Sequence, residues 1–335
     1  MQWRVHRCQQ VHPMAASGCL DVAIAVIRDP GGACLVARRP QDRPQGGRWE
    51  FPGGKVAPGE SPARALAREL EEELGILPRR AAPLITVAHD YPEGCVRLHV
   101  FTVHGYAGSP RGREGQPLRW MAVQDLPGLE FPDANRPILR ALSLPDCYLI
   151  TPDHPHPEQV LWGLARSLET GMVRLVQLRA PARTQAEVLA LAREAVPLCH
   201  RHGARILVNG DPETAAAAGA DGVHLNGERL ARWAAKGPWP QDGGLVAASV
   251  HDASSLEQAR RLGCDFVVIS PVAPTATHPG VEPLGWPRFA SLARAAGCPV
   301  YALGGMTPAH IPRARACGGQ GVAGIRGLWR GDPLR

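Results

Sequence analysis

The stretch GKVAPGESPARALARELEEELGI, residues 54–76, decides the fold of the N-terminal part of this chain. It places a glycine-containing loop directly before a segment rich in carboxylates. Ser61 suits a helix N-cap, Pro62 the first turn, and Gly75 the position just past the last turn. We therefore expect a helix over residues 62–74. At about 100° per residue, one stripe of this helix is apolar, and it contains Ala63, Leu66, Ala67, Leu70 and Leu74.

Three glutamates, Glu69, Glu72 and Glu73, share the adjoining arc of the expected helix. Like charges at this spacing repel each other by about 0.2–0.5 kcal/mol per pair. One interpretation is an acidic face that is simply solvated. The other is a site for a divalent cation that neutralises the glutamates. Magnesium suits this role because it prefers oxygen ligands and bridges them to phosphates, and manganese is the alternative ion.

The spacing of the whole stretch resembles the signature of the Nudix hydrolases at nine fixed positions over 23 residues, from Gly54 to Ile76. The preceding WEFPGGK, residues 49–55, is similar to the MutT-type branch, which cleaves nucleoside triphosphates to a monophosphate and pyrophosphate. The resemblance implies that the three glutamates hold magnesium and that Gly53 contributes a backbone carbonyl. Arg68 and Glu60 are spaced for an ion pair that orients the loop against the helix.

A fourth carboxylate, Glu114, lies in Glu-Gly-Gln-Pro followed by Trp120-Met121. In MutT-type enzymes, which this pattern resembles, such a loop supplies another metal-binding or water-activating carboxylate. We expect water to attack a phosphorus of the triphosphate, with the phosphorus next to the nucleoside favoured. Which glutamate takes the proton of that water stays open.

Recognition of the base is expected at FPDANRP, residues 131–137, which resembles the Phe-Pro-x-Ala-Asn stretch of the MutT branch. The resemblance implies that Asn135 reads an oxidised guanine, because an amide donates and accepts hydrogen bonds at once. The alternative is that Asn135 only caps a helix. Arg39 and Phe51 match family positions beside the base, and Glu93 stands where the family has an aspartate. This predicts hydrolysis of 8-oxo-dGTP, a sanitation of the nucleotide pool that supports DNA repair.

Composition limits the class of protein. The charge of +6 comes almost wholly from scattered arginines, since the only lysines are Lys55 and Lys236; a groove for a nucleic-acid polymer is therefore not expected. The nine cysteines are dispersed and contain no Cys-x-x-Cys, which predicts reduced thiols, no zinc site and a cytoplasmic location. No apolar run suits a signal peptide or a membrane span. The oligomeric state is not determined.

A length of 335 residues favours two domains. We expect an N-terminal extension over residues 1–17, a Nudix domain over 18–143, a linker at Leu144-Pro145-Asp146 and a second domain over 147–335. The Nudix resemblance implies an α/β/α sandwich with a mixed sheet. Apolar runs predict its strands at residues 21–28, 33–38, 84–89, 96–104 and 120–121, and a closing helix at 135–142.

From residue 147 onward, apolar runs alternate with helical segments, which predicts a parallel (β/α) barrel of TIM type. The runs are residues 148–151, 175–178, 205–208, 222–225, 246–250, 266–269, 300–303 and 321–325. Because little sequence follows the eighth run, we expect irregular closure. YLIT at 148–151, QLR at 177–179, GADGVHL at 219–225, SVH at 249–251 and GGM at 304–306 resemble the thiamine phosphate synthase and thiazole tautomerase (TenI-type) family.

Such barrels cradle phosphate on backbone N–H groups after the seventh and eighth strands, which here implicates Gly304, Gly305, Gly324 and Gly327. The alternative is that these glycines only turn the chain. Pro181 replaces the synthase lysine, and Gly210 and Arg229 replace its two magnesium aspartates. The acid–base histidine of the tautomerase falls at Pro271.

We therefore expect a barrel that binds a thiamine-related phosphate ligand without synthase activity. Two other hypotheses remain. In one, the hydrolase acts on damaged thiamine-precursor pyrophosphates. In the other, the barrel is a sensing module or a scaffold. His224 and His251 lie at strand ends and are either structural or chemical.

Overall fold

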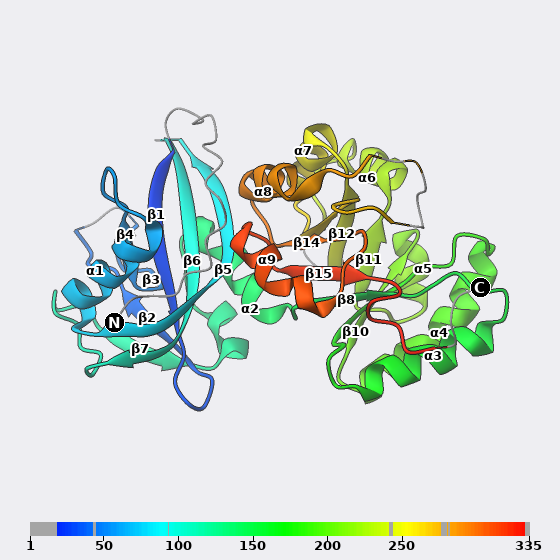
Figure 1. Cartoon of the computed structure of the whole chain (residues 1–335), viewed down its shortest axis with the longest axis horizontal. Coiled ribbons are helices and arrows are strands. Elements are labelled where there is room, and N and C mark those ends of the chain that lie inside the picture. Colours follow the sequence, from blue (N-terminus) through cyan, green and yellow to red (C-terminus); the bar gives the residue numbers. More distant parts are fainter. Residues whose placement is uncertain are drawn as a thin grey trace.

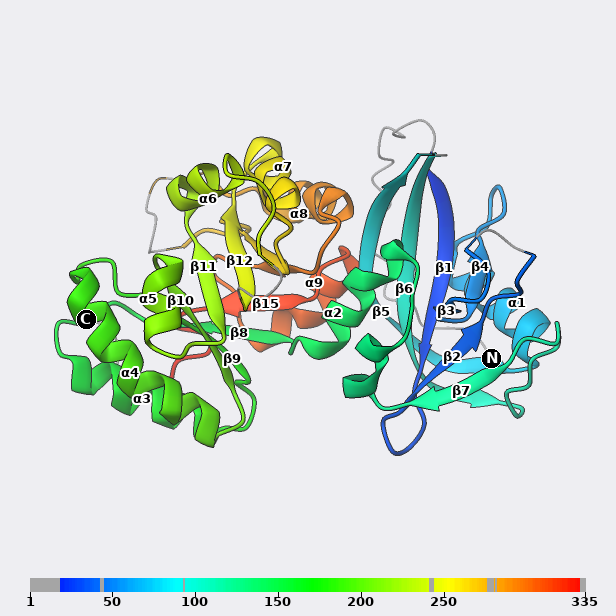
Figure 2. The same cartoon turned by 180° about the vertical axis from the view of Figure 1, so that it is seen from behind.

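The computed structural model of the chain describes residues 19–42, 45–92, 94–240, 244–275, 280 and 282–331. Two α/β units lie side by side, an N-terminal sheet domain and a C-terminal barrel (Figure 1). Helix α2 (Arg136–Ser143) lies between them in this view and in the view from behind (Figure 2).

The N-terminal domain contains, in chain order, β1 (Leu20–Ile27), β2 (Cys34–Arg38), β3 (Trp49–Glu50), β4 (Gly53–Lys55), α1 (Pro62–Leu74), β5 (Leu77–Tyr91), β6 (Gly94–Ala107), β7 (Leu118–Met121), two short 3-10 helices (Val123–Gly128 and Asp133–Asn135) and α2. One sheet has the order β4-β1-β6-β5 and the other the order β3-β2-β7. Because β1 pairs parallel with β6 and antiparallel with β4, the larger sheet is mixed.

Helices cover both faces of this sheet. Successive side chains of a strand point to opposite faces, and in β1 the side chains of Ala23, Ala25 and Ile27 pack with α1. Those of Ile24 and Val26 pack in a second apolar core that includes α2. The expected α/β/α sandwich is confirmed.

The two long strands extend beyond the apolar runs that predicted them. We expected strands over 84–89 and 96–104, whereas β5 spans Leu77–Tyr91 and β6 spans Gly94–Ala107. Pro78 and Pro83 lie inside β5, and the register with β6 shifts beside both. Bulges and an edge position tolerate proline, because its missing N–H is not needed there for a ladder hydrogen bond.

The C-terminal domain contains β8 (Cys147–Ile150), α3 (Pro157–Glu169), β9 (Leu175–Leu178), α4 (Gln185–Arg201), β10 (Arg205–Asn209), α5 (Pro212–Ala217), β11 (Gly222–Leu225), α6 (Gly227–Ala234), β12 (Leu245–Val250), α7 (Ala253–Leu262), β13 (Phe266–Ile269), α8 (Gly285–Ala295), β14 (Val300–Ala302), a 3-10 helix (Pro308–His310), α9 (Ile311–Ala316) and β15 (Gly321–Gly324). Its strands form a closed parallel barrel in the order β10-β11-β12-β13-β14-β15-β8-β9. The TIM-type barrel is confirmed.

The expectation of irregular closure is wrong, because β15 pairs with both β14 and β8. In place of a long eighth helix, Trp329 packs against Gly163 of α3 and joins the apolar core outside the strands. The interior of the barrel is filled by a separate apolar cluster that includes Tyr148, Phe266 and Tyr301.

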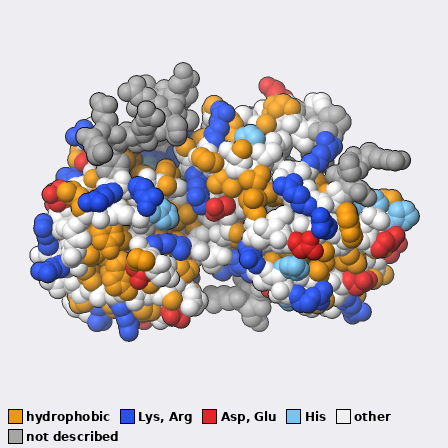
Figure 3. All heavy atoms as spheres, turned by 60° about the horizontal axis from the view of Figure 1, so that its bottom comes forward, with side chains coloured by type: hydrophobic (Ala, Val, Ile, Leu, Met, Phe, Trp, Pro, Cys, Tyr) orange, Lys and Arg blue, Asp and Glu red, His pale blue; other side chains and the backbone are white. Residues whose placement is uncertain are grey.

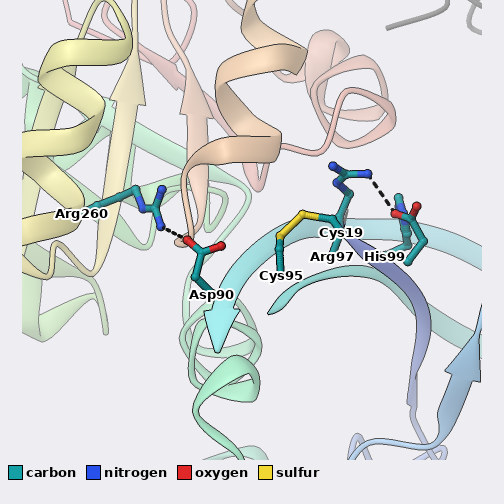
Figure 4. Close-up of a disulfide and its surroundings, with 7 residues drawn as sticks. Cys19, Asp90, Cys95, Arg97, His99 and Arg260 are labelled. Carbon is teal, nitrogen blue, oxygen red and sulfur yellow. Dashed lines mark hydrogen bonds and ion pairs between the residues drawn. A yellow bond between two sulfur atoms is a disulfide. The ribbon is translucent and has the colours of Figure 1, made fainter. Parts of the chain in front are cut away.

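The edge strand β5 faces α8 and α9 of the barrel. The backbone N–H of Thr86 donates to the carbonyl of Gly318 at 3.3 Å. Asp90 of the same strand forms an ion pair of 2.9 Å with Arg260 of α7 (Figure 4). The barrel therefore covers an edge whose backbone groups would otherwise be unpaired.

Residues 144–146, the segment expected to link the domains, lie against the barrel floor, by which we mean the end of the barrel where its strands begin. Leu144 is buried in the interior cluster of the barrel. The carbonyl of Pro145 accepts a hydrogen bond from the Tyr301 hydroxyl at 2.5 Å. Asp146 forms an ion pair of 2.5 Å with Arg315. The segment is thus held by side chains of β14 and α9 of the barrel.

The expectation that all thiols are reduced is wrong for one pair, since Cys19 and Cys95 form a disulfide (Figure 4). In the parallel register of β1 and β6, Leu20 lies opposite Val96, so the residues before them are adjacent. Their Cα atoms are 4.4 Å apart although 76 positions separate them in the sequence. Residues this far apart leave no local sign of pairing.

Within the described residues, no helix has the length and apolarity needed to cross a membrane. On the face of the molecule drawn in Figure 3, Lys and Arg side chains are spread over both domains and do not gather in one patch.

Candidate functional site

The ends of helix α1 follow the capping residues. The Ser61 hydroxyl accepts a hydrogen bond from the N–H of Arg64 at 3.4 Å, Pro62 begins the helix, and Gly75 has a φ of 70° at its C-terminal end. These local features place α1 against β4, the short strand that begins with Gly53 and Gly54 and belongs to the segment predicted as a glycine loop.

The buried face of α1 differs from the expected stripe at its first turns. Leu66, Leu70 and Leu74 are buried as expected, but Ala63 is exposed and Ala65 is buried instead. Ala65 lies on the arc of Glu69 and Glu73, since these positions are one and two turns further along the same side. The Glu69 side chain is 15% exposed and that of Glu72 is 58% exposed. Part of the acidic face is therefore covered rather than solvated.

Arg68 connects the loop to the helix. Its guanidinium donates two hydrogen bonds to Glu60, at 3.0 and 3.2 Å, and one to the carbonyl of Lys55 at 3.0 Å. It also bonds to Glu69 at 2.7 Å and Glu72 at 3.2 Å. Hydrogen bonding from Arg68 lowers the pKa of Glu60. The ion pair expected from the sequence is present and orients the loop.

The pKa of Glu73 is strongly raised. The Oε2 of Glu73 accepts a hydrogen bond from the N–H of Gly53 at 3.3 Å. Burial raises the pKa of Glu73 to about 7, and the nearby carboxylates of Glu50, Glu69 and Glu114 add to the rise. Glu50 of β3 thus belongs to this acidic cluster although sequence reasoning missed it. The available signal was its position directly before the Phe51-to-Lys55 loop.

The two loop glycines permit the close approach of the surrounding groups. A Cβ atom on Gly53 would lie 2.0 Å from the carbonyl oxygen of Ala23, and its φ is 145°. A Cβ atom on Gly54 would lie 2.2 Å from the carboxylate carbon of Glu69. Backbone atoms and a positive φ require glycine at Gly53, whereas a side chain at Gly54 would displace the carboxylate of Glu69.

The loop that carries Glu114 is held against the end of α1. The N–H of Arg113 donates to the carbonyl of Glu73 at 2.9 Å, and the Gln116 amide donates to the same carbonyl at 3.2 Å. The Gln116 side chain also accepts from the N–H of Glu114 at 2.9 Å. The fold therefore brings Glu114 near enough to Glu73 for its charge to act on that carboxylate.

The donor set suits a hard divalent cation, because it consists of carboxylates and the Gly53 carbonyl. Crowding of these carboxylates contributes to the raised pKa of Glu73, and a cation would relieve that repulsion. Among the described residues, however, no three acidic, His or Cys side chains lie in a ligand arrangement. Arg68 neutralises Glu69 and Glu72 in this state.

The expected base pocket lies at the N-terminal end of α2. The rings of Phe51 and Phe131 stack with centroids 5.5 Å apart, and both are buried. Asn135 is 7% exposed and occupies the N-cap position of α2, but its side chain makes no capping hydrogen bond. Its Oδ1 is buried and has no hydrogen-bond partner in the part of the chain that the structure describes.

The two remaining predicted base contacts have different outcomes. Arg39 forms an ion pair with Glu50, which connects it to the acidic cluster. Glu93 lies outside the described residues. Beside it, the Tyr91 hydroxyl accepts a hydrogen bond from the N–H of Ala134 at 3.3 Å and so supports the segment before Asn135.

The barrel has a cavity of about 560 Å³ at the end where its strands finish. All four glycines that the sequence predicted for phosphate binding line it, namely Gly304, Gly305, Gly324 and Gly327. Gly304 has a φ of 109°, and a Cβ atom there would lie 2.9 Å from the carbonyl of Ala273. Gly304 and Gly305, which both have a positive φ, therefore turn the chain and also line the cavity.

A buried polar chain ends at this cavity. The Nε2 of His224 lies 2.9 Å from the Ser249 hydroxyl, and its Nδ1 lies 3.3 Å from the Tyr148 hydroxyl. Burial lowers the pKa of His224 to about 3, so its ring is neutral near pH 7. His251, also at the cavity, bonds through Nδ1 to the carbonyl of Ser270 at 2.7 Å.

A second cavity of about 320 Å³ lies beside the first, and Arg179 lines both. The three positions where the sequence departs from the synthase pattern, Pro181, Gly210 and Arg229, all line it. Arg229 forms an ion pair of 3.2 Å with Asp211. A fixed guanidinium thus stands where the family pattern has a magnesium-binding carboxylate.

Comparisons with known proteins give separate matches for the N-terminal sheet domain and for the C-terminal barrel. Residues 23–141 match the NUDIX domain family and residues 147–328 match the thiamine monophosphate synthase family. The 8-oxo-dGTP diphosphatase of Escherichia coli is 36% identical over 123 residues, which are 37% of this chain and 95% of that protein. The putative thiamine-phosphate synthase of Geobacter sulfurreducens is 39% identical over 185 residues, 54% of this chain and 85% of that protein.

Among solved structures, one from a study of MutT of Aliivibrio salmonicida and Vibrio cholerae is similar to the N-terminal domain. It is 34% identical in sequence, has a TM-score of 0.33, and the match covers 37% of this chain and 95% of that chain.

Proposed function

This chain belongs to the Nudix hydrolase family over residues 23–141 and to the thiamine monophosphate synthase family over residues 147–328, and on that premise we propose a magnesium-dependent hydrolase of oxidised guanine nucleoside triphosphates. Its substrate of choice is 8-oxo-dGTP, its products are the monophosphate and pyrophosphate, and its role is sanitation of the nucleotide pool. Cleavage of a diphosphate bond follows from the family. We propose in addition the preference for an oxidised guanine base, the dependence on magnesium and the role of the barrel.

The acidic cluster behind the glycine loop carries this proposal. Glu73 is half-buried near Glu50, Glu69 and Glu114; desolvation, and then repulsion from these carboxylates, raises its pKa. Arg68 and Arg39 pair with other members of the cluster, and a divalent cation would relieve the repulsion at Glu73, which favours a metal function over a structural one.

Different residues of the site would bind the metal, accept a proton and position the loop. Magnesium, when bound, neutralises the phosphate oxygens and lowers the pKa of water; Glu69, Glu72, Glu73, Glu114 and the Gly53 carbonyl would hold it. A carboxylate of this set accepts the proton of the attacking water. A bond forms from the water oxygen to phosphorus as the bond from phosphorus to the pyrophosphate oxygen breaks. Arg68 and Glu60 keep the loop in place.

Selection of the base is assigned to the N-terminal end of α2. The buried Oδ1 of Asn135 lacks a partner among the described residues, and a buried acceptor without a partner costs about 1–3 kcal/mol. A purine edge that donates a hydrogen bond to this atom would remove that cost. The same amide offers donors to an acceptor on the purine.

The barrel is assigned the binding of a small phosphate ester related to thiamine, without synthesis of thiamine phosphate. Four glycines at one cavity support the first part. The second part is supported by Arg229, which is paired with Asp211 and cannot ligate magnesium.

A substrate panel tests the function of the hydrolase. The full chain is assayed with magnesium against 8-oxo-dGTP, dGTP, ATP and thiamine-precursor pyrophosphates, and pyrophosphate and monophosphate are quantified. We expect the highest kcat/KM for 8-oxo-dGTP, with dGTP lower by at least about tenfold, or 1.4 kcal/mol. A highest kcat/KM for a thiamine-precursor pyrophosphate would replace this function with the alternative.

A further inference from the structure

The C-terminal end of α2 is completed by the other domain. The last four carbonyls of a helix have no partners within it. In α2, the Gln320 amide donates to the carbonyls of Ala141 and Leu144, both at 3.0 Å. Arg205 donates to the carbonyl of Ser143 at 2.6 Å. The helix of the hydrolase domain thus ends on side chains of the barrel.

These donors come from separate parts of the barrel floor. Arg205 begins β10, Gln320 precedes β15, and Tyr301 of β14 donates to the next carbonyl, that of Pro145. Gln320 is only 1% exposed, so water does not compete for its hydrogen bonds. Asp265, before β13, also forms an ion pair of 2.6 Å with Arg140 of α2. Four points on the floor therefore fix this end of the helix.

The other end of α2 is the expected base pocket. Asn135 is the residue directly before the helix, and eight residues at about 1.5 Å each separate it from the anchored end by about 12 Å. Ile138 and Ala141 of the helix are buried in the apolar core that α2 shares with the sheet. A change of tilt at the C-terminal end would move the amide of Asn135.

A second contact with the barrel supports the same pocket. Strand β5 is fixed through Thr86 to Gly318 and through Asp90 to Arg260. The residue after Asp90 is Tyr91, whose hydroxyl accepts the hydrogen bond from Ala134. The hydrogen bond that supports the segment before α2 therefore comes from a strand that is itself held by the barrel.

We propose that Gln320 of the barrel is a positioning residue for base recognition by the hydrolase domain, acting through α2 on Asn135. Arg205 and Tyr301 assist it on the neighbouring carbonyls. The barrel then contributes to the specificity of the hydrolase in addition to holding its own ligand. This inference rests on the proposed function, because it takes Asn135 as the group that reads the base.

The test is Gln320→Leu in the full chain, which removes both donated hydrogen bonds at similar side-chain size. KM for 8-oxo-dGTP should rise at least about fivefold while kcat stays within about twofold, so the selectivity over dGTP falls. The control is Ser167→Ala, which removes a buried hydrogen bond to the carbonyl of Gly163 in α3, on the far side of the barrel from α2. It should leave the selectivity unchanged.

A double-mutant cycle separates positioning from general damage. If Gln320 acts through Asn135, Gln320→Leu should have no further effect on selectivity in an Asn135→Ala background. Equal effects in both backgrounds would overturn the inference. Should Gln320→Leu not fold, Tyr301→Phe removes only the hydroxyl that donates to Pro145 and serves in the same cycle.

The outcomes distinguish this inference from the proposed function. A wild-type enzyme without preference for 8-oxo-dGTP over dGTP overturns the proposed function and the inference together. A wild-type preference that the Gln320 or Tyr301 variant leaves unchanged overturns the inference alone.

Discussion

The carboxylate of Glu73 accepts a hydrogen bond from the backbone N–H of Gly53, with 3.3 Å between the two atoms. This bond joins the glycine loop to the last turn of α1. It also holds the half-buried carboxylate of Glu73 near Glu50, Glu69 and Glu114. Desolvation, with a smaller contribution from these three charges, raises the pKa of Glu73 to about 7. Loop, helix and acidic cluster therefore act as one unit.

Glu73→Gln should reduce kcat/KM by at least about 10²-fold, because the charge needed for a metal ligand or a proton acceptor is lost. The amide keeps the volume and an acceptor for Gly53, so thermal unfolding should change little. Pyrophosphate release and circular dichroism melting measure the two effects. The control is Glu71→Gln, an exposed glutamate of the same helix, which should retain activity. Turnover near that of the wild type for Glu73→Gln would exclude it from the site.

Removal of divalent cations should abolish hydrolysis, because the carboxylates alone repel the substrate phosphates. After dialysis against a chelator, addition of magnesium should restore kcat, and manganese should also be active since it accepts the same oxygen ligands. The readout is pyrophosphate release at fixed ionic strength. Full activity in excess chelator would contradict the metal assignment.

Asn135→Ala should lower the preference for 8-oxo-dGTP by about 1–3 kcal/mol in the ratio of kcat/KM values, because a purine edge loses its partner. Stability should not fall, since the Asn135 side chain makes no capping hydrogen bond and its truncation removes a buried acceptor that has no partner among the described residues. The matched control is Asn226→Ala, which removes a true cap that accepts from Arg229 N–H at 2.9 Å. It should cost about 1 kcal/mol of stability without a change in selectivity. A loss of stability without a change in selectivity for Asn135→Ala would show that Asn135 is a structural cap.

The barrel should bind thiamine phosphate or thiazole phosphate in calorimetry with the full chain, and should form no thiamine phosphate in a coupling assay. Gly304→Ala should weaken binding at least about tenfold, because an L side chain is strained at this φ and crowds the cavity wall. Gly171→Ala is the control, since it also has a positive φ but open space around it. Robust synthesis would contradict the inactive-synthase assignment, and absence of binding would leave the barrel a scaffold.

His224 should make stability fall at acidic pH. Burial lowers its pKa to about 3 in the folded state, whereas an unfolded histidine titrates near about 6.5. Between these two pKa values, His224 is protonated in the unfolded chain and neutral in the folded chain. The free energy of unfolding should therefore fall by up to about 1.4 kcal/mol per pH unit as the pH drops from 6.5 toward 3. Urea unfolding at pH 7 and pH 5 should show a smaller loss for His224→Gln than for the wild type; equal losses would contradict this.

The local elements could be read from the sequence because their causes are local. Ser61 and Gly75 end α1 through hydrogen bonds within a few residues of themselves. The barrel strands are short apolar runs because both of their faces are buried. The glycine loop and the glutamates spaced behind it likewise indicate the chemistry of the site, because loop and helix are contiguous in the sequence.

Contacts across long stretches of sequence were decided only by the tertiary structure. Glu50 joins the acidic cluster, Cys19 pairs with Cys95 over 76 positions, and Gln320 reaches the carbonyl of Ala141 over 179 positions. The length of β5 depends on a partner strand and on bulges that accommodate its prolines. No local pattern marks Cys19, Cys95 or Gln320, because the burial and pairing of a polar side chain depend on which distant segments the fold places beside it.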